Sequence, residues 1–293
     1  MRKQYYISFS VAPEEGPRFS RFVEEMGCAD GWRDIDQYRV RPGFEHVFEG
    51  GDPRLGSVLR FLETSGVKWL ERCEHIWTVQ ELREAPLLEF RLEMAPREWK
   101  SLHYREQFDF STGCPRCGIG ALQVGPLRVK VSALPKKALM CETLDGEYLV
   151  AEPLREALEA AGTRGAEVIQ VVSPRDEPVG WWQVVPRQEM PPLRSETRGF
   201  IRDPGVKGCP ECRRDTWCHT GDEPSEFVYG RSQLRDRPLP DVAETYERVG
   251  VSGFDVNGYL PRGRLLVSPR IFDVLQRLKV RGARFNPVRI IDD

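Results

Sequence analysis

The sequence predicts an α+β fold in which mixed or antiparallel sheets carry a few short helices. The first observation is an alternation of apolar and polar residues over residues 4–11, which is the period of a half-buried strand. The second is a set of short amphipathic stretches that end at glycine, as over residues 52–66. The third is a pair of Cys-x-x-Cys knuckles at residues 114–117 and 209–212, a spacing typical of zinc sites.

Length and composition are those of an ordinary globular protein. The 293 residues, 40% hydrophobic and 30% charged, suffice for one large domain or two modest ones. The net charge of −2 gives no overall attraction to nucleic acid or an anionic membrane. No apolar run approaches the length of a membrane span, about 18 residues, and the N-terminus begins as a strand without a signal-like apolar region. Eight cysteines without an export signal indicate a reducing compartment, so we expect a cytoplasmic protein.

In the N-terminal third, the strand of residues 4–11 is expected to lead to a helix that Pro17 begins and Gly27 ends. Residues 32–48 have the pattern of strand and turn. The helix of residues 52–66 has a capping aspartate, a proline at its first helical position and apolar residues at helical spacing. A further strand is expected to follow it.

The rest of the chain alternates short strands and helices. Further strands or extended stretches are expected at residues 75–82, 87–94, 127–132, 147–151, 167–172, 181–185, 264–267 and after Gly282. Helices are expected at residues 153–161, 241–249 and 269–279. A turn is expected at Asn257 and Gly258.

An internal repeat organises the second half. Sliding the chain by 117 residues places Leu158 on Leu275 and Gly165 on Gly282, with the flanking strands in register. Each copy is a strand–helix–glycine–strand unit that lies downstream of one knuckle, and residues 52–69 form a weaker third match. We therefore expect two related strand–helix–strand units joined by the four-cysteine knuckle pair.

We expect two parts in the chain. The first is an N-terminal α+β lobe over residues 1–110. The second is a zinc-linked domain of two repeat units over residues 111–293, sharing a continuous core with the lobe.

The two knuckles could place four thiolates around one ion, Cys114 and Cys117 from the first and Cys209 and Cys212 from the second. Proline at the second position of each presets the turn. Gly118 after the first knuckle can adopt a positive φ that lets backbone N–H groups face the sulfurs. The 91 residues between Cys117 and Cys209 exceed the spacing of a compact zinc ribbon, so a shared zinc ion would join distant parts of the chain.

Alternatives remain at this stage. A thioredoxin-like redox pair needs a helix after the cysteines, which the glycines after Cys117 disfavour. Simple thiols or disulfides are a further reading. Because Arg213 stands where the first knuckle has Gly118, the second knuckle is the less ideal copy, and Cys218 or His219 could replace one of its ligands. The remaining cysteines, Cys28, Cys73 and Cys141, have apolar neighbours and are expected in the core.

No catalytic motif is present in the sequence. It contains no His-Glu-x-x-His, no Gly-x-Ser-x-Gly elbow, no Walker loop and no strand-associated Gly-x-Gly-x-x-Gly. A zinc ion with four thiolate ligands has no open position for water activation. We therefore expect a structural zinc ion and a protein that is not an enzyme.

The long knuckle spacing resembles the double-CXXCG motif family, known mainly as myxobacterial paralogues that include immunity proteins of swarming-inhibition toxin systems. The ending over residues 265–272 and 282–288 is similar to the close of other polymorphic-toxin immunity families. The resemblance covers roughly residues 100–293. Arg213 departs from the second motif.

The resemblance implies a cytoplasmic immunity protein that binds and neutralises a cognate protein toxin. The acidic helix face of Glu152, Glu156 and Glu159 is the first candidate for the partner-binding surface, since many intracellular toxins are basic nucleases.

Two other functions are weighed against it. A zinc-ribbon module that binds nucleic acid would use the basic residues 263–289, but the overall charge and the knuckle spacing make nucleic acid an unlikely partner. A thiol redox protein is the remaining alternative.

Overall fold

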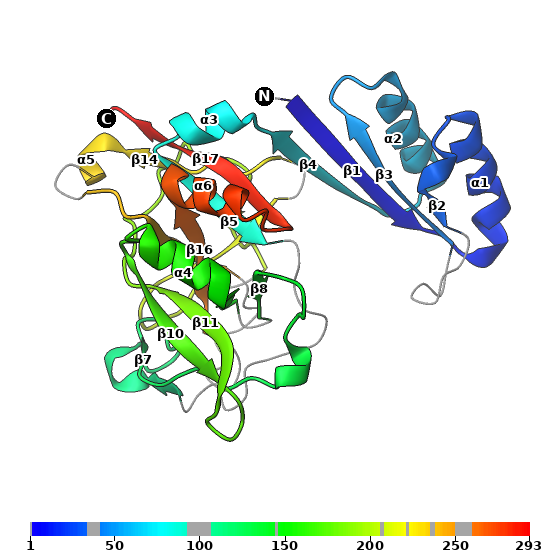
Figure 1. Ribbon diagram of the computed structural model, residues 1–293. Helices are drawn as coiled ribbons and strands as arrows, with labels where there is room; N and C mark the ends of the chain where they lie inside the picture. Colours follow the sequence, from blue (N-terminus) through cyan, green and yellow to red (C-terminus); the bar gives the residue numbers. More distant parts are fainter. Residues whose placement is uncertain are drawn as a thin grey trace. The chain divides into compact units, whose positions relative to one another are not determined.

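The computed structural model of the chain describes residues 2–33, 42–92, 107–143, 146–205, 208–220, 223–234, 238–249 and 260–293. The turn expected at Asn257 and Gly258 lies outside these residues. The chain has the predicted α+β architecture, with antiparallel and mixed sheets and short helices (Figure 1). No helix of the described part is long and apolar enough to cross a membrane.

Two compact units make up the chain: Met1–Thr78 with Thr220–Pro224, and Val79–His219 with Ser225–Asp293. The sequence predicts a division at residue 110 instead. Strand β5 (Leu87–Leu92) accounts for the difference, because it pairs with β16 (Arg262–Val267) and β17 (Ala283–Ile291) inside the second unit. Each unit also has hydrophobic clusters of its own.

The first unit is a four-stranded antiparallel sheet with two helices packed on one face (Figure 1). Its elements are β1 (Arg2–Ser10), α1 (Gly16–Glu25), β2 (Trp32–Arg33), β3 (Gly43–Glu49), α2 (Pro53–Ser65) and β4 (Trp69–Ile76). The strand order is β2-β3-β1-β4, so each helix connects two strands that have a third between them. This is the split βαβ arrangement.

Capping explains where α2 begins and ends. The side chain of Asp52 accepts a hydrogen bond from the Arg54 backbone N–H, and Pro53 occupies the first turn. Gly66 ends the helix at a φ of 67°, a conformation that costs other residues free energy. Val58 and Leu62 face the sheet and are fully buried.

The second unit contains the remaining elements. Its strands are β5, β6 (Phe108–Asp109), β7 (Leu122–Gln123), β8 (Met140–Glu142), β9 (Tyr148–Ala151), β10 (Ala166–Val172), β11 (Pro178–Pro186), β12 (Phe200–Arg202), β13 (Thr216–His219), β14 (Val228–Gly230), β15 (Val242–Val249), β16 and β17. Its helices are α3 (Val79–Glu84), α4 (Glu152–Ala160), α5 (Arg231–Leu234) and α6 (Pro269–Arg277). Three sheets result, ordered β10-β11-β9-β8, β12-β13-β15-β16-β5-β17-β14 and β6-β7.

The two strand–helix–strand units predicted from the repeat are β9-α4-β10 and β16-α6-β17. In each, an antiparallel strand lies between the two strands that the helix connects: β11 in the first and β5 in the second. The glycines that precede the last strand, Gly165 and Gly282, both have positive φ. The buried stripes also correspond, with Leu154 and Leu158 matching Ile271 and Leu275. The α2 segment between β3 and β4 has the same arrangement around β1.

Three local predictions are wrong. Residues 127–132, expected as a strand, contain only an isolated bridge from Arg128 to Val172, and residues 131–133 form a single 3-10 turn. Residues 241–249 form strand β15 instead of a helix, because Val242, Thr245 and Val249 are β-branched and the strand has β16 on one side and β13 on the other. The extended stretch expected over residues 75–82 ends at Ile76, and α3 follows it.

Candidate metal centre

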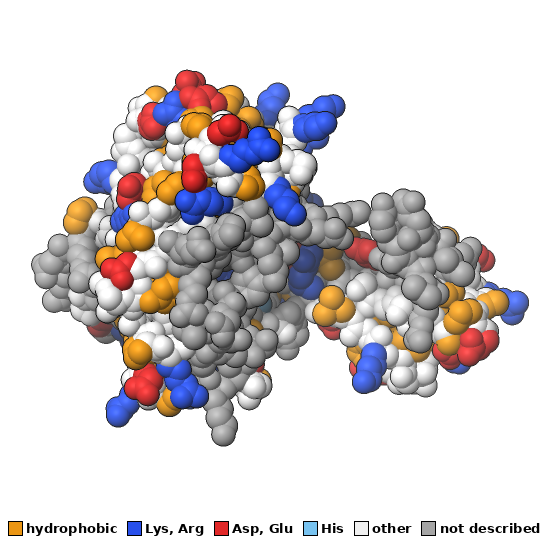
Figure 2. All heavy atoms as spheres, turned by 90° about the horizontal axis from the view of Figure 1, so that it is seen from below, with side chains coloured by type: hydrophobic (Ala, Val, Ile, Leu, Met, Phe, Trp, Pro, Cys, Tyr) orange, Lys and Arg blue, Asp and Glu red, His pale blue; other side chains and the backbone are white. Residues whose placement is uncertain are grey.

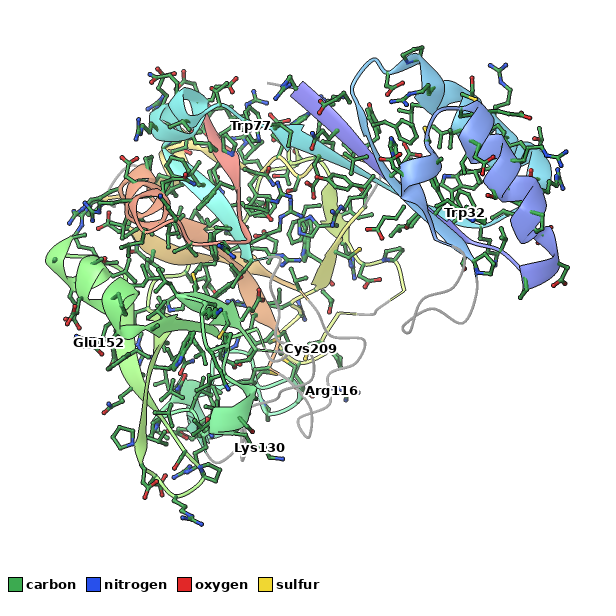
Figure 3. All side chains as sticks on the ribbon, turned by 45° about the vertical axis from the view of Figure 1, so that its right-hand side comes forward. Trp32, Trp77, Arg116, Lys130, Glu152 and Cys209 are labelled. Carbon is green, nitrogen blue, oxygen red and sulfur yellow. The ribbon has the colours of Figure 1, made fainter. Side chains whose placement is uncertain are left out.

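Four cysteine sulfurs lie together in the second unit. The Sγ atoms of Cys114, Cys117, Cys209 and Cys212 are all within 4.8 Å of one another. Two of these separations join the knuckles, 3.7 Å from Cys114 to Cys209 and 3.6 Å from Cys117 to Cys212. The sequence prediction that these four thiols meet is therefore correct, although 91 residues separate the knuckles. Figure 3 labels Cys209, with Arg116 of the first knuckle nearby.

The first knuckle is a tight backbone loop. The N–H of Gly118 donates to the carbonyl of Cys114 at 2.8 Å, and the N–H of Cys114 donates to the carbonyl of Ile119 at 2.8 Å. Gly118 has a φ of 72°, and a Cβ there would lie 2.5 Å from Leu260 Cδ2. Glycine is therefore required both by the backbone conformation and by the space available.

The second knuckle repeats the same hydrogen bonds. The N–H of Arg213 donates to the carbonyl of Cys209 at 2.8 Å, and the N–H of Cys209 donates to the carbonyl of Arg214 at 2.9 Å. Arg213 has a φ of 56°, the left-handed conformation that Gly118 adopts in the first knuckle. The arginine thus leaves the loop geometry intact but places an L-residue where glycine is favoured.

Replacing Arg213 with glycine is expected to stabilise the protein by about 1 kcal/mol, because it removes the left-handed strain of an exposed side chain. Arg213→Ala is the control: it removes the same side chain but keeps Cβ, so it should stabilise much less. Urea unfolding of the three proteins measures the difference. Equal stability of the glycine and alanine variants would contradict the explanation.

Backbone amides and burial shift the pKa values of the sulfurs in opposite directions. Burial raises the pKa of the Cys114 thiol, but the N–H groups of Cys117 and Arg116 donate to its sulfur, and the pKa falls to about 7. Burial raises the pKa of Cys117 well above its ordinary value. Burial also raises the pKa of Cys212. A group of thiols held this closely, with Cys117 and Cys212 reluctant to ionise alone, is a donor set suited to a cation that stabilises thiolates.

Other cysteines and His219 do not belong to this group. Within the described residues, the only cluster of potential metal-binding side chains consists of the four knuckle cysteines. The His219 side chain instead lies 3.6 Å from the buried Glu89 carboxylate, and burial lowers its pKa to about 4. Cys28, Cys73 and Cys141 are buried, and burial raises the pKa of Cys141 to about 12.

An ion-pair network, which we call the Glu189 network, attaches the second knuckle to β15. Arg214 follows the knuckle and donates to both oxygens of Glu189, at 2.7 and 3.0 Å. Arg248 on β15 pairs with the same carboxylate and, at 2.8 Å, with Glu244. The Arg214 guanidinium also lies 4.0 Å from the ring centroid of Tyr246. The four charged residues of the network, together with residues 118–121 after the first knuckle, line a hollow of about 350 Å³.

Sequence reasoning missed the Glu189 network. Its members are far apart in the chain and occur in stretches with no motif. In the sequence, Arg214 and Arg248 have the pattern of ordinary surface charges. In the folded chain both pair with the Glu189 carboxylate.

Elsewhere in the second unit, burial favours the protonated, uncharged form of the Glu142 side chain on β8. Burial raises its pKa to about 7, with Arg264 opposing and Glu147 reinforcing the shift. Between about pH 4.5 and 7 the folded protein therefore retains a proton that the unfolded chain has lost, so stability falls as pH rises through this window.

Replacing Glu142 with glutamine should remove this pH dependence. From pH 5 to pH 8 we expect the wild-type free energy of unfolding to fall by about 2 kcal/mol relative to that of Glu142→Gln. Urea titrations at pH 5, 6.5 and 8 measure the difference between the two proteins. A difference that stays constant across this range would contradict the assignment.

The acidic face predicted on α4 is partly neutralised within its own helix. Arg155 pairs with Glu152, with Glu159 at 2.6 Å and with Glu156 at 3.8 Å. Its guanidinium also lies 4.9 Å from the Trp182 ring centroid. Three acids thus share one arginine, so α4 has less free negative charge than the sequence suggests.

Comparison with known proteins gives no family assignment: no protein-family model matches the chain, and no curated protein matches it.

Proposed function

We propose that the chain is an immunity protein that binds and neutralises a cognate protein toxin in the cytoplasm, on a scaffold that one structural zinc ion holds together. One observation carries this proposal: four thiols from two knuckles 91 residues apart lie within 4.8 Å of one another. Such a group is the ligand set of a closed tetrahedral zinc site.

The four cysteines would hold zinc as thiolates, each with Zn–S bonds of about 2.3 Å. The ion would join the loop after β6 to the loop between β12 and β13. Because a set of four thiolates fills the coordination shell, it leaves no position for a substrate or an activated water. This favours a structural role for the ion, and with it a binding protein over an enzyme.

The toxin as partner rests on the resemblance of the paired knuckles and of the C-terminal stretch to immunity families. The long spacing fits that resemblance better than it fits a compact zinc ribbon. Affinity would come from a few desolvated anchor side chains and complementary charge.

Co-expression with the toxin encoded beside this gene tests the proposal. We expect this protein to restore growth of cells producing the toxin and to co-purify with it. A Cys209→Ser/Cys212→Ser double variant should lose protection, whereas Cys218→Ser, outside the cluster, should retain it. Absence of both rescue and co-purification with the wild-type protein would reject the proposed function.

A further inference from the structure

A strongly basic segment surrounds the first knuckle. Residues 113–141 contain five cationic side chains and no acidic one, whereas the whole chain has a net charge of −2. The rest of the chain is therefore −7, by subtraction of +5 from −2. The segment is therefore one of two basic stretches of the chain, the other being residues 263–289, and it is a local source of positive potential.

Most of these cations have no partner within the described residues. Arg128 pairs with Asp176 at 2.8 Å. By contrast, Arg116, Lys130, Lys136 and Lys137 are exposed, and no carboxylate of the described part of the chain forms an ion pair with them. Their charge is thus available to a partner, whereas the α4 glutamates share Arg155.

Exposed aliphatic side chains lie among the cations. Leu122 is 51% exposed, Val124 67% and Val131 56%, so all three are among the most exposed large apolar residues described. The segment is nevertheless well anchored, because Leu127 and Val129 are fully buried in a core cluster. A segment fixed by buried side chains that still presents apolar ones to solvent is typical of an interaction surface.

Three of these residues, Leu122, Arg116 and Lys130, can be placed toward one end of the second unit. Strand β7, which contains Leu122, is at the lower end of the unit in Figure 1, and Figure 3 places Arg116 and Lys130 toward the same end. Figure 2 looks onto this end from below, where lysine, arginine and hydrophobic side chains lie at the surface together with acidic ones.

We propose that the basic surface formed by Arg116, Lys130, Lys136 and Lys137 with Leu122, Val124 and Val131 binds an acidic protein surface. This inference rests on the proposed function, because it takes the acidic partner to be the toxin. It assigns the toxin contact to this basic surface and not to the acidic face of α4. Charge complementarity selects an acidic partner, and the aliphatic side chains select a partner with apolar area to bury.

Nucleic acid fits this surface less well. Binding of single strands relies on aromatic side chains that stack on bases, and residues 111–147 contain no Phe, Tyr or Trp. The net charge of −7 on the rest of the chain would also repel a phosphate backbone. An acidic protein presents its negative charge over a limited area, so it can contact the basic surface without approaching the acidic rest of the chain.

A matched pair of charge-reversal variants tests the surface against the toxin encoded beside the gene. The test variant is Lys130→Glu/Lys136→Glu/Lys137→Glu. The control is Arg277→Glu/Lys279→Glu/Arg281→Glu, which makes the same change of charge at exposed positions around the end of α6. We expect the test variant to bind toxin roughly 100-fold more weakly and the control to stay within about 3-fold of wild type. All positions are exposed, and matching thermal unfolding verifies that both variants fold.

A second readout examines the chemistry without the toxin. Fluorescence anisotropy measures binding to labelled poly-L-glutamate and to a 20-nucleotide single strand of DNA, at low and at physiological salt. We expect wild type to bind polyglutamate more tightly than DNA, the test variant to lose that binding and the control variant to keep it. Leu122→Ser/Val124→Ser should weaken toxin binding about 10-fold while leaving polyglutamate binding unchanged.

The outcomes separate this inference from the proposed function. If polyglutamate binding depends on the three lysines but the protein binds no toxin, the basic surface is supported as a site for acidic proteins and the toxin is rejected as its partner. Equal toxin binding by the test and control variants would overturn the surface and retain the immunity function. Tighter binding of DNA than of polyglutamate, or no binding of polyglutamate, would overturn the acidic-protein assignment.

Discussion

Replacing Cys209 with serine is expected to lower the free energy of unfolding of the zinc-loaded protein by at least about 5 kcal/mol. Cys209 is 1% exposed and lies 3.7 Å from the sulfur of Cys114, so its loss removes a buried ligand and leaves the remaining thiols without a complete coordination shell. Because metal binding is coupled to folding, the lost zinc affinity appears as lost stability. Denaturant unfolding with excess zinc, followed by circular dichroism, measures this effect.

Cys218→Ser is the matched control. Cys218 is half-buried on β13, close in sequence to the second knuckle but outside the sulfur cluster, so its replacement should change stability by less than about 1 kcal/mol. A chelator should destabilise wild type and Cys218→Ser alike and leave Cys209→Ser unchanged. If Cys209→Ser and Cys218→Ser were equally stable in zinc, the four-thiol scaffold would be contradicted.

Glu189→Gln is expected to destabilise the protein by about 3 kcal/mol. Glu189 accepts hydrogen bonds from Arg214 and Arg248, and the Arg248 side chain is only 8% exposed. Removing the carboxylate would leave a buried guanidinium with Glu244 as its remaining ion-pair partner among the described residues. The change also detaches the second knuckle from β15, so zinc affinity should decrease together with stability.

Glu167→Gln provides the comparison for an exposed ion pair. Glu167 pairs with Arg187, and both side chains are more than a third exposed, so this change should cost less than about 1 kcal/mol. Guanidinium unfolding and zinc titration of both variants measure the two effects. A Glu189→Gln variant as stable as Glu167→Gln would show that the Glu189 network does not hold the knuckle.

Local signals explain why parts of this fold could be predicted. A capping residue, Pro53 and Gly66 define α2 within a few neighbours, and the period of apolar residues defines β1. The repeat also predicted a real similarity, because helices that begin with proline in the first turn connect strands with the same spatial relation. The four cysteines could be grouped together because two Cys-x-x-Cys knuckles supply the four ligands of one zinc site.

Other features depend on partners far away in the sequence. Residues 242–249 form a strand because β13 and β16 flank them, an arrangement that a local pattern does not reveal. β5 belongs to the second unit only because strands near the C-terminus pair with it on both sides. Glu189 likewise becomes important only when Arg214 and Arg248 reach it. Such long-range pairing is the hardest feature to predict from a single sequence, because it leaves no local pattern.

The central claim is that four cysteine thiolates hold one zinc ion. Zinc K-edge X-ray absorption on the purified protein, with elemental analysis of the same sample, tests it most directly. We predict one zinc per chain, with four sulfur ligands at about 2.3 Å. Absence of zinc from protein purified in its presence, or a shell with nitrogen or oxygen replacing any of the four sulfurs, would contradict the account.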